Sequence, residues 1–162
     1  MDDLISARTR AEELWHEAYS QQLNGELADA MALYQASIEV YSTAEAHTFL
    51  GWCYSFLGRY EDAITECLKA IEIDPAFGNP YNDIGVYLIE QDRHRDAIEW
   101  LQRATLAPRY EAPHFPWLNL GRVYQKLGPW SEAVRCYRTA IEVEPDYRVA
   151  KEALKLLIAR MN

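Results

Sequence analysis

Histidines and cysteines are the residues of this 162-residue chain that are best able to bind a metal or act as nucleophiles. When a local motif encodes a zinc site or a Cys–His pair, it places such residues only a few positions apart. None of the four histidines lies three or four residues from another histidine or from a cysteine, and the three cysteines form no C-x-x-C pair. No glycine-rich loop of the phosphate-binding type is present. The sequence therefore predicts no metal, no cofactor and no enzymatic activity.

Aromatic side chains are the stronger candidates, because they can anchor a protein ligand. Trp52 and Phe56 lie four residues apart, so that they share one face of a helix. Leu50, Tyr54 and Leu57 already supply an apolar packing stripe on that helix, which makes the two aromatics surplus to the needs of a core. We interpret Trp52 and Phe56 as ligand anchors. The alternative is that they pack between neighbouring structural units.

The elements that must position these residues recur along the chain. Gly51, Gly85 and Gly121 are separated by 34 and 36 residues, and an alanine follows each of them by 12 and by 19 positions. A fixed period in this range is the signature of a repeat protein. In the best-defined copy, one helix ends at Gly58 and a second helix ends before Pro75. One such hairpin cannot bury its apolar stripe alone, so that the hairpins are expected to stack.

These residues resemble the tetratricopeptide repeat family, whose unit is a helix–turn–helix hairpin. The third copy is looser than its neighbours, because Leu88 replaces the expected tyrosine and Asp92 the turn glycine. The resemblance implies an all-α fold, a right-handed superhelical array of hairpins in one domain spanning residues 1–162. The expected repeats are a degenerate one at about residues 11–43, then residues 44–77, 78–113 and 114–147.

Both ends of the chain are expected to be helical. Residues 3–23 form one long predicted helix. If Gly25 is the turn glycine of the first repeat, Trp15 and Tyr19 face a groove, whereas a turn two residues longer would place them in the core. Residues 148–162 are predicted to form a capping helix over the last repeat. Its apolar stripe consists of Ala150, Leu154, Leu157, Ile158 and Met161.

The resemblance also implies a binding surface, because in the family the first helix of each repeat lines a concave groove that holds a peptide. Transferred to this sequence, those positions give a groove rich in aromatic side chains, with amide and guanidinium groups that suit a peptide backbone or a carboxylate. One subclass of the family grips the carboxylate tail of heat-shock chaperones, but its clamp residues are absent from this sequence. The predicted partner-binding residues are Trp15, Tyr19, Thr48, Trp52, Phe56, Asn82, Val86, Phe115, Leu118, Arg122, Gln125 and Lys126.

The charge distribution narrows the class of partner. Residues 1–80 carry 4 basic and 14 acidic side chains, whereas residues 81–162 carry 12 basic and 11 acidic ones. Because phosphate binding needs clustered lysine and arginine, neither nucleic acid nor a membrane surface is an expected partner. A protein that is basic or has apolar anchors is expected instead. The sequence has no apolar segment of signal-peptide or membrane-spanning length, and we expect a cytoplasmic protein.

Together these features predict a non-enzymatic adaptor or scaffold that binds a peptide segment of a partner protein in its groove. One alternative is a small acidic assembly or secretion chaperone, which the size and the sequence pI of 4.9 fit. Another is a scaffold that self-associates through the groove or through the open end of its first repeat, where apolar surface would be exposed.

Overall fold

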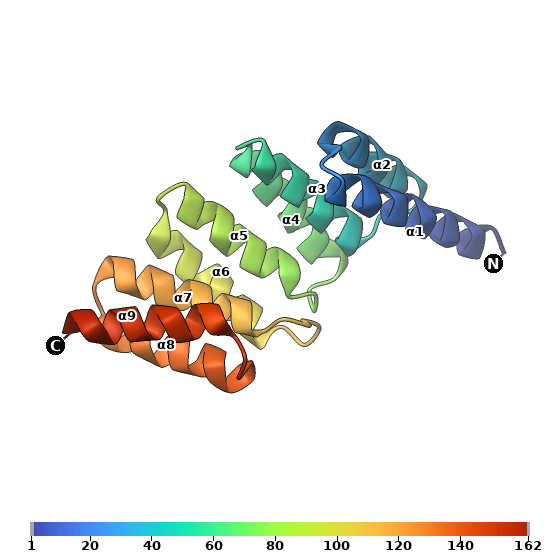
Figure 1. Ribbon diagram of the computed structural model, residues 1–162. Coiled ribbons are helices and arrows are strands. Elements are labelled where there is room, and N and C mark those ends of the chain that lie inside the picture. The colour runs from blue at the N-terminus through green and yellow to red at the C-terminus, as the bar shows by residue number, and fades with distance from the viewer. Residues whose placement is uncertain (1, 162) are drawn as a thin grey trace. The chain divides into compact units, whose positions relative to one another are not determined.

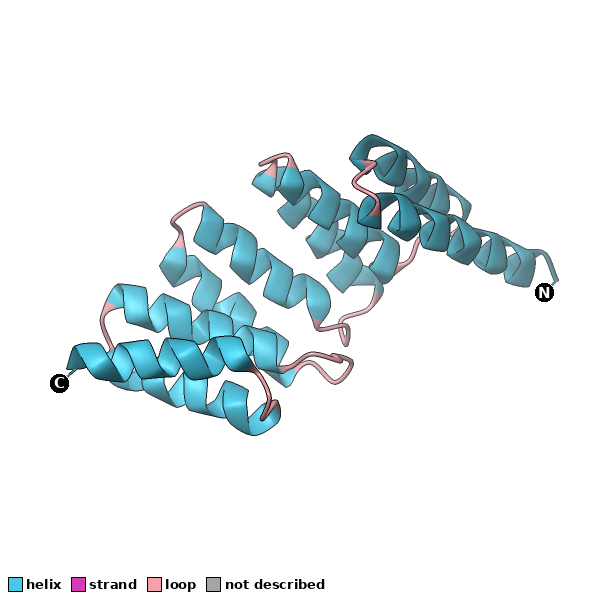
Figure 2. Cartoon of the chain, viewed as in Figure 1, coloured by secondary structure: helices cyan, strands magenta, loops and turns pink. Residues whose placement is uncertain are grey.

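A computed structural model describes residues 2–161, and no strand occurs in that part of the chain (Figures 1 and 2). Its nine helices follow one another as helix–turn–helix hairpins with a last helix at the end. This architecture confirms the predicted all-α repeat array. The helices are α1 (Asp2–Leu23), α2 (Leu27–Val40), α3 (Ala44–Phe56), α4 (Tyr60–Ile73), α5 (Asn79–Glu90), α6 (His94–Leu106), α7 (His114–Leu127), α8 (Trp130–Val143) and α9 (Arg148–Met161).

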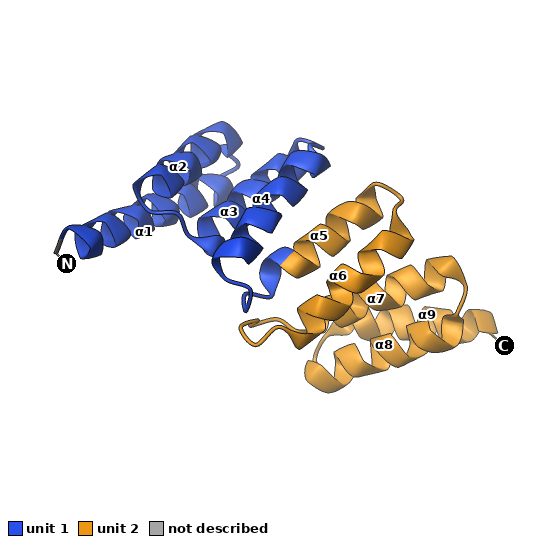
Figure 3. Cartoon of the chain, turned by 180° about the vertical axis from the view of Figure 1, so that it is seen from behind, with its two compact units in different colours: residues 1–80 blue, residues 81–162 orange. Residues whose placement is uncertain are grey.

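The chain divides into two compact units at the boundary between Pro80 and Tyr81 (Figure 3). Unit 1 contains α1 to α4. Unit 2 contains α6 to α9 and most of α5.

Capping and turn residues mark where the helices of each hairpin begin and end. Thr43 caps α3, because its hydroxyl accepts the Ala46 backbone N–H at 3.2 Å, an interaction that is typically worth about 1 kcal/mol. After α4, Asp74 adopts an extended conformation ahead of the proline that stops the helix. The turn at Gly58 has a φ of 70°, and in the looser repeat Asp92 takes the same left-handed conformation with a φ of 59°. Aspartate tolerates this conformation better than most residues, which explains how the turn forms without a glycine.

One core cluster of unit 1 packs three small residues and Leu50 around Tyr34. Ala18, Ala30 and Cys53 are fully buried together with Tyr34. The Ser37 hydroxyl donates to the Ala11 carbonyl at 2.7 Å and thereby fixes α2 against α1.

The structure selects one of the two registers left open for the first repeat. Gly25 is the left-handed turn residue between α1 and α2, with a φ of 84°. With that turn, Ala18 faces the core, while Trp15 and Tyr19 are only half-buried. One core prediction in this unit is wrong: Leu57 is 52% exposed, because α3 ends at Phe56 and Leu57 follows it outside the packed stripe.

The last helix, α9, packs against α7 and α8. Ala150 and Leu157 of α9 are fully buried against α7 and α8, and Leu154 packs beside them. Ile158 and Met161 do not belong to that packed stripe, because both are exposed. Ile158 directly follows the buried Leu157 and so lies about 100° round the helix from it, and Met161 occupies the last described turn.

Candidate functional site

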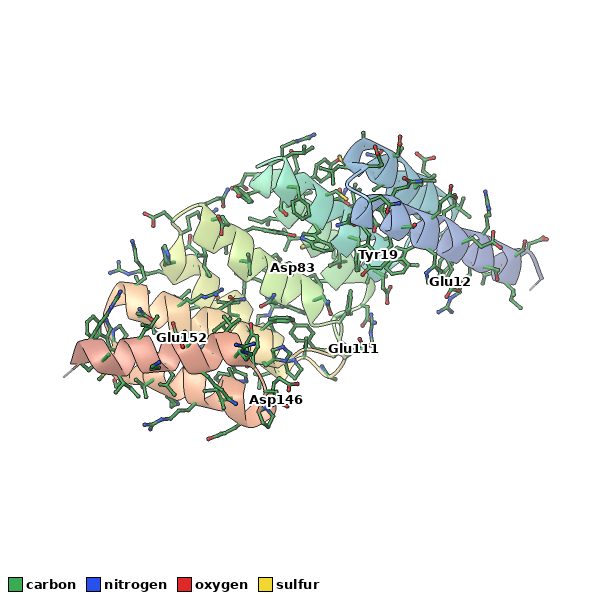
Figure 4. All side chains as sticks on the ribbon, viewed as in Figure 1. Glu12, Tyr19, Asp83, Glu111, Asp146 and Glu152 are labelled. Carbon is green, nitrogen blue, oxygen red and sulfur yellow. The ribbon has the colours of Figure 1, made fainter. Side chains whose placement is uncertain are left out.

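Five aromatic side chains from α1 and α3 form a continuous row in unit 1. We call Trp15, Tyr19, Phe49, Trp52 and Phe56 the aromatic row. Trp15 stacks on Tyr19 with ring centroids 5.6 Å apart, and both rings meet Phe49 edge-on at 5.1 and 5.5 Å. Phe49 then contacts Trp52 at 5.9 Å, and Trp52 contacts Phe56 at 5.5 Å. Tyr19 is labelled on α1 in Figure 4.

Helical spacing explains why the row is continuous. Trp15 and Tyr19 lie four residues apart on α1, as do Trp52 and Phe56 on α3, so that each pair shares a face. Exposure increases along the row, from the half-buried Trp15, Tyr19 and Phe49 to Trp52 at 39% and Phe56 at 62%. The row therefore ends in an open aromatic surface. Phe49 joins its two halves and was not among the predicted site residues.

A small cavity adjoins the buried end of the aromatic row. Its volume is about 240 Å³, and the indole nitrogen of Trp15 has no hydrogen-bond acceptor among residues 2–161. A buried donor without an acceptor costs free energy that an added acceptor would recover. The residues lining the cavity are Arg8, Ala11, Glu12, Trp15, His16, Thr43 and Glu45, of which Glu12 is labelled in Figure 4.

Unit 2 carries a chain of polar side chains in place of aromatic ones. The Asn119 amide donates to the Asn82 carbonyl oxygen at 3.1 Å, and Arg122 donates to the Asn119 carbonyl oxygen at 3.4 Å. Asn82 in turn donates to the Asp83 carboxylate at 3.4 Å, and burial raises the pKa of that carboxyl to about 7. The chain thus leads from buried groups to the exposed guanidinium of Arg122. Asn119 is a member that sequence reasoning missed.

Three predicted site residues lie inside the fold. Thr48 is buried and donates to the Ala44 carbonyl at 2.7 Å, and Leu118 belongs to the core of unit 2. Both stand three residues before a repeat glycine, a position that the packing covers. Neither side chain offers a free surface to a ligand, and Asn82 at the same position is buried too.

The remaining predicted residues of unit 2 differ in their exposure and in the contacts they make. Gln125 is engaged on both sides, since its amide oxygen accepts from Tyr137 at 2.8 Å and its backbone carbonyl accepts from the Trp130 indole at 3.1 Å. Val86 is half-buried, whereas Lys126 is exposed. Phe115 is exposed on one side and packs its ring on those of His114 and Tyr147.

The cysteines are placed as buried small residues. All three are free thiols, and burial raises the pKa of Cys53 and of Cys136 to about 11, which leaves both protonated at neutral pH.

Among the described residues no group of three or more His, Cys, Asp or Glu side chains is arranged to hold a metal ion. None of the described helices has the length and hydropathy needed to span a membrane.

Comparison with known families identifies the repeats. Two models described as tetratricopeptide repeat match residues 44–77 and 114–147. A third model, described as an Est1 DNA/RNA binding domain, matches residues 68–111.

One known protein is similar in sequence to part of this chain. The chain is 30% identical over 96 residues to the small glutamine-rich tetratricopeptide repeat-containing protein 2 of Mycosarcoma maydis; the match covers 53% of this chain but only 27% of that protein's length.

Among solved structures, PilF of Pseudomonas aeruginosa superposes with a TM-score of 0.90 at 18% identity, covering 96% of this chain and 71% of that one. YrrB, described as a TPR protein with an unusual peptide-binding site, superposes with a TM-score of 0.69 at 22% identity, covering 91% of this chain and 76% of that one. At these identities the two structures show a shared fold.

Proposed function

The chain is a member of the tetratricopeptide repeat family, and on that premise we propose that it is an interaction module whose aromatic row binds a peptide segment of a partner protein. The family supplies protein-binding scaffolds, and the unusual peptide-binding site named for YrrB is one precedent for the finer assignment.

One observation carries the proposal: the exposed end of the aromatic row is not needed by the core. Leu50 and Cys53 fill the interior on the same helix, yet Trp52 and Phe56 remain 39% and 62% exposed. Tryptophan and other rigid aromatic side chains at an open surface are the residues that most often dominate binding energy in protein interfaces. The row therefore supports apolar anchoring of a ligand.

The charges of unit 1 support a partner with basic residues beside those anchors. With 14 acidic and 4 basic side chains in residues 1–80, a basic segment would be attracted and would associate faster at low ionic strength. Nucleic acid is a poorer fit. Even residues 68–111, which match the Est1 model, carry five basic and eight acidic side chains.

The proposal is tested by selecting peptides from a random display library on the full chain and measuring their affinity for variants. Trp52→Ala should weaken a selected peptide by about 2 kcal/mol, or roughly 30-fold, as expected for an anchor in the binding surface. Trp130→Ala is the matched control, because Trp130 has a similar exposure of 36% but lies outside the row. Equal loss in both variants, or loss only in the control, would show that the row is not the binding surface.

A further inference from the structure

Three polar side chains in unit 1 form a hydrogen-bonded line that the binding surface does not use. Ser42 Oγ lies 2.9 Å from Nε2 of His47, and Nδ1 of His47 lies 2.5 Å from Oε2 of Glu66. The other oxygen of Glu66 accepts from Lys69 Nζ at 2.7 Å. His47 and Glu66 are buried, whereas Ser42 is exposed in the segment before α3.

The ionisation state of the Glu66 carboxyl group determines where the protons lie in this line. Burial alone would raise the pKa of its carboxyl group, but the hydrogen bonds and charges of His47 and Lys69 lower that pKa below its ordinary value. The ionised carboxylate can only accept, so that Nδ1 of His47 must donate to it. In the neutral ring Nε2 then carries the lone pair and accepts the hydroxyl hydrogen of Ser42. A base held by a carboxylate is thus placed beside an exposed hydroxyl.

The other repeats show that packing does not require this line. His47 stands four residues before its repeat glycine and Glu66 fifteen residues after it. At these positions the other three repeats have only apolar or aromatic residues, and the Tyr81 and Trp100 rings contact each other at 6.3 Å. A buried charged pair contributes less to stability than such packing, because both groups lose their hydration. The corresponding pairs are Leu14 with Leu33, Tyr81 with Trp100, and Trp117 with Cys136.

We propose that Ser42 is an activated nucleophile that accepts acyl groups from ester or thioester donors, with His47 as its general base and Glu66 as the positioning residue. Nucleophile, base and orienting carboxylate within hydrogen-bond reach are the geometric signature of such serines on unrelated folds. Ser42 also stands two residues before α3, where the positive end of the helix dipole favours the negative charge that forms on the acyl oxygen. This activity goes beyond the proposed binding function and does not depend on it.

The reaction can be written with p-nitrophenyl acetate as the acyl donor. Ser42 Oγ attacks the acetyl carbon while its proton moves to Nε2 of His47, and the bond to the aryl oxygen breaks to release 4-nitrophenolate. After His47 has passed the proton to solvent, it can take a proton from water as that water attacks the acetyl group. Acetic acid leaves and gives its own proton to solvent, and the proton on His47 returns to Ser42 Oγ.

The test is acetylation of the full chain by p-nitrophenyl acetate, followed by nitrophenolate release and by peptide mapping in the mass spectrometer. Ser42 should be acetylated much faster than Ser131, an exposed serine in α8 that serves as an internal comparator. Ser42→Ala should abolish the fast phase. Trp130→Ala, which lies in unit 2 and outside the aromatic row, should leave it unchanged.

A double variant, His47→Leu with Glu66→Leu, keeps Ser42 but installs the apolar pair of the first repeat. It should remain folded and lose roughly 100-fold or more in the rate of Ser42 acetylation, the usual contribution of a general base. Glu66→Gln should lower the rate of Ser42 acetylation. Glu66→Asp should lower it less, because the carboxylate is kept. Acetylation of Ser42 no faster than that of Ser131, or an unchanged rate in the folded double variant, would overturn the proposal.

Discussion

The hairpins at the two ends of the repeat array share a tyrosine–glutamine hydrogen bond, but the two units present different surfaces. In the hairpin of α1 and α2, the Tyr34 hydroxyl donates to the Gln22 amide oxygen at 2.8 Å. In the hairpin of α7 and α8, Tyr137 donates to Gln125 in the same way, again at 2.8 Å. Both tyrosines are completely or almost completely buried, so that the interior of the hairpin is alike in unit 1 and unit 2.

The two units differ in the residues at their exposed positions. Trp52 and Phe56 of unit 1 stand where unit 2 has Arg122 and Lys126, 70 residues later at the same distance from the repeat glycine. The buried positions are constrained because two helices must approach closely there: a Cβ atom added to Gly121 would lie only 2.3 Å from the Tyr137 ring. The outer positions have no such constraint. The comparison teaches that equivalent outer positions of the repeat can present an apolar or a cationic surface, while the glycine at the close helix crossing, Gly51 or Gly121, stays the same.

The largest expected effect tests the shared interior. Tyr34→Ala and Tyr137→Ala should each lower the free energy of unfolding by about 3–5 kcal/mol, because each removes a large, buried aromatic side chain. Tyr→Phe at the same positions is the control and should cost only about 1 kcal/mol, the net value of one hydrogen bond. Urea unfolding measures both. A large loss at one position with almost none at the other would show that the two hairpins are not equivalent.

Deleting residues 148–162 tests whether the end of unit 2 depends on α9. The deletion uncovers the apolar side of α7 and α8 that Ala150 and Leu157 now bury, and exposed apolar surface promotes association. We expect dimers or larger species in sedimentation velocity, together with a lower melting temperature. A truncated chain that stays monomeric with an unchanged melting temperature would contradict this account of the cap.

The polar chain of unit 2 makes stability depend on pH. Burial holds the pKa of Asp83 at about 7, above the ordinary value of 3.8, so the folded state favours the protonated carboxyl. Its contribution to stability is complete below pH 3.8 and is lost as the pH rises through 7. Asp83→Asn should therefore raise the melting temperature at pH 8 and have little effect at pH 4. A variant that melts below the wild type at pH 8 would refute this reading of Asp83.

The smallest expected effect on stability lies at the open end of the aromatic row. Phe56→Ala should change the free energy of unfolding by less than about 1 kcal/mol, since substitutions at exposed positions usually have small effects. Leu50→Ala in the same helix is the buried comparison and should cost about 2–5 kcal/mol. If thermal melts showed equal losses, Phe56 would be a packing residue and the surfaces of the two units would differ less than we infer.

The sequence predicted the helices and turns because the repeat pattern is local. Glycine and alanine at a fixed period identify the hairpins, and even the substitution at Asp92 keeps the turn. Errors arose where a helix ends or where the face of a residue depends on a neighbouring repeat. Leu57 falls outside α3, and Thr48 is buried rather than open to a ligand.

The side-chain networks were harder to predict, because their members lie far apart in the sequence. Asn119 meets Asn82 across 37 residues, and His47 meets Glu66 across 19. A search for residues three or four positions apart cannot find such pairs. A search at equivalent positions of the repeats would have found His47 and Glu66, since only that repeat replaces an apolar pair with a hydrogen-bonded polar one.

The binding role of the aromatic row is tested most directly by the indole ¹H–¹⁵N signals of the five tryptophans during titration with a library-selected peptide. Every tryptophan reports on its own surroundings, and no residue of the row needs to be changed. We predict that the Trp15 and Trp52 signals shift together as the peptide saturates, while those of Trp100 and Trp130 stay in place. Shifts confined to Trp100, Trp117 or Trp130 would contradict the assignment of the binding surface to unit 1.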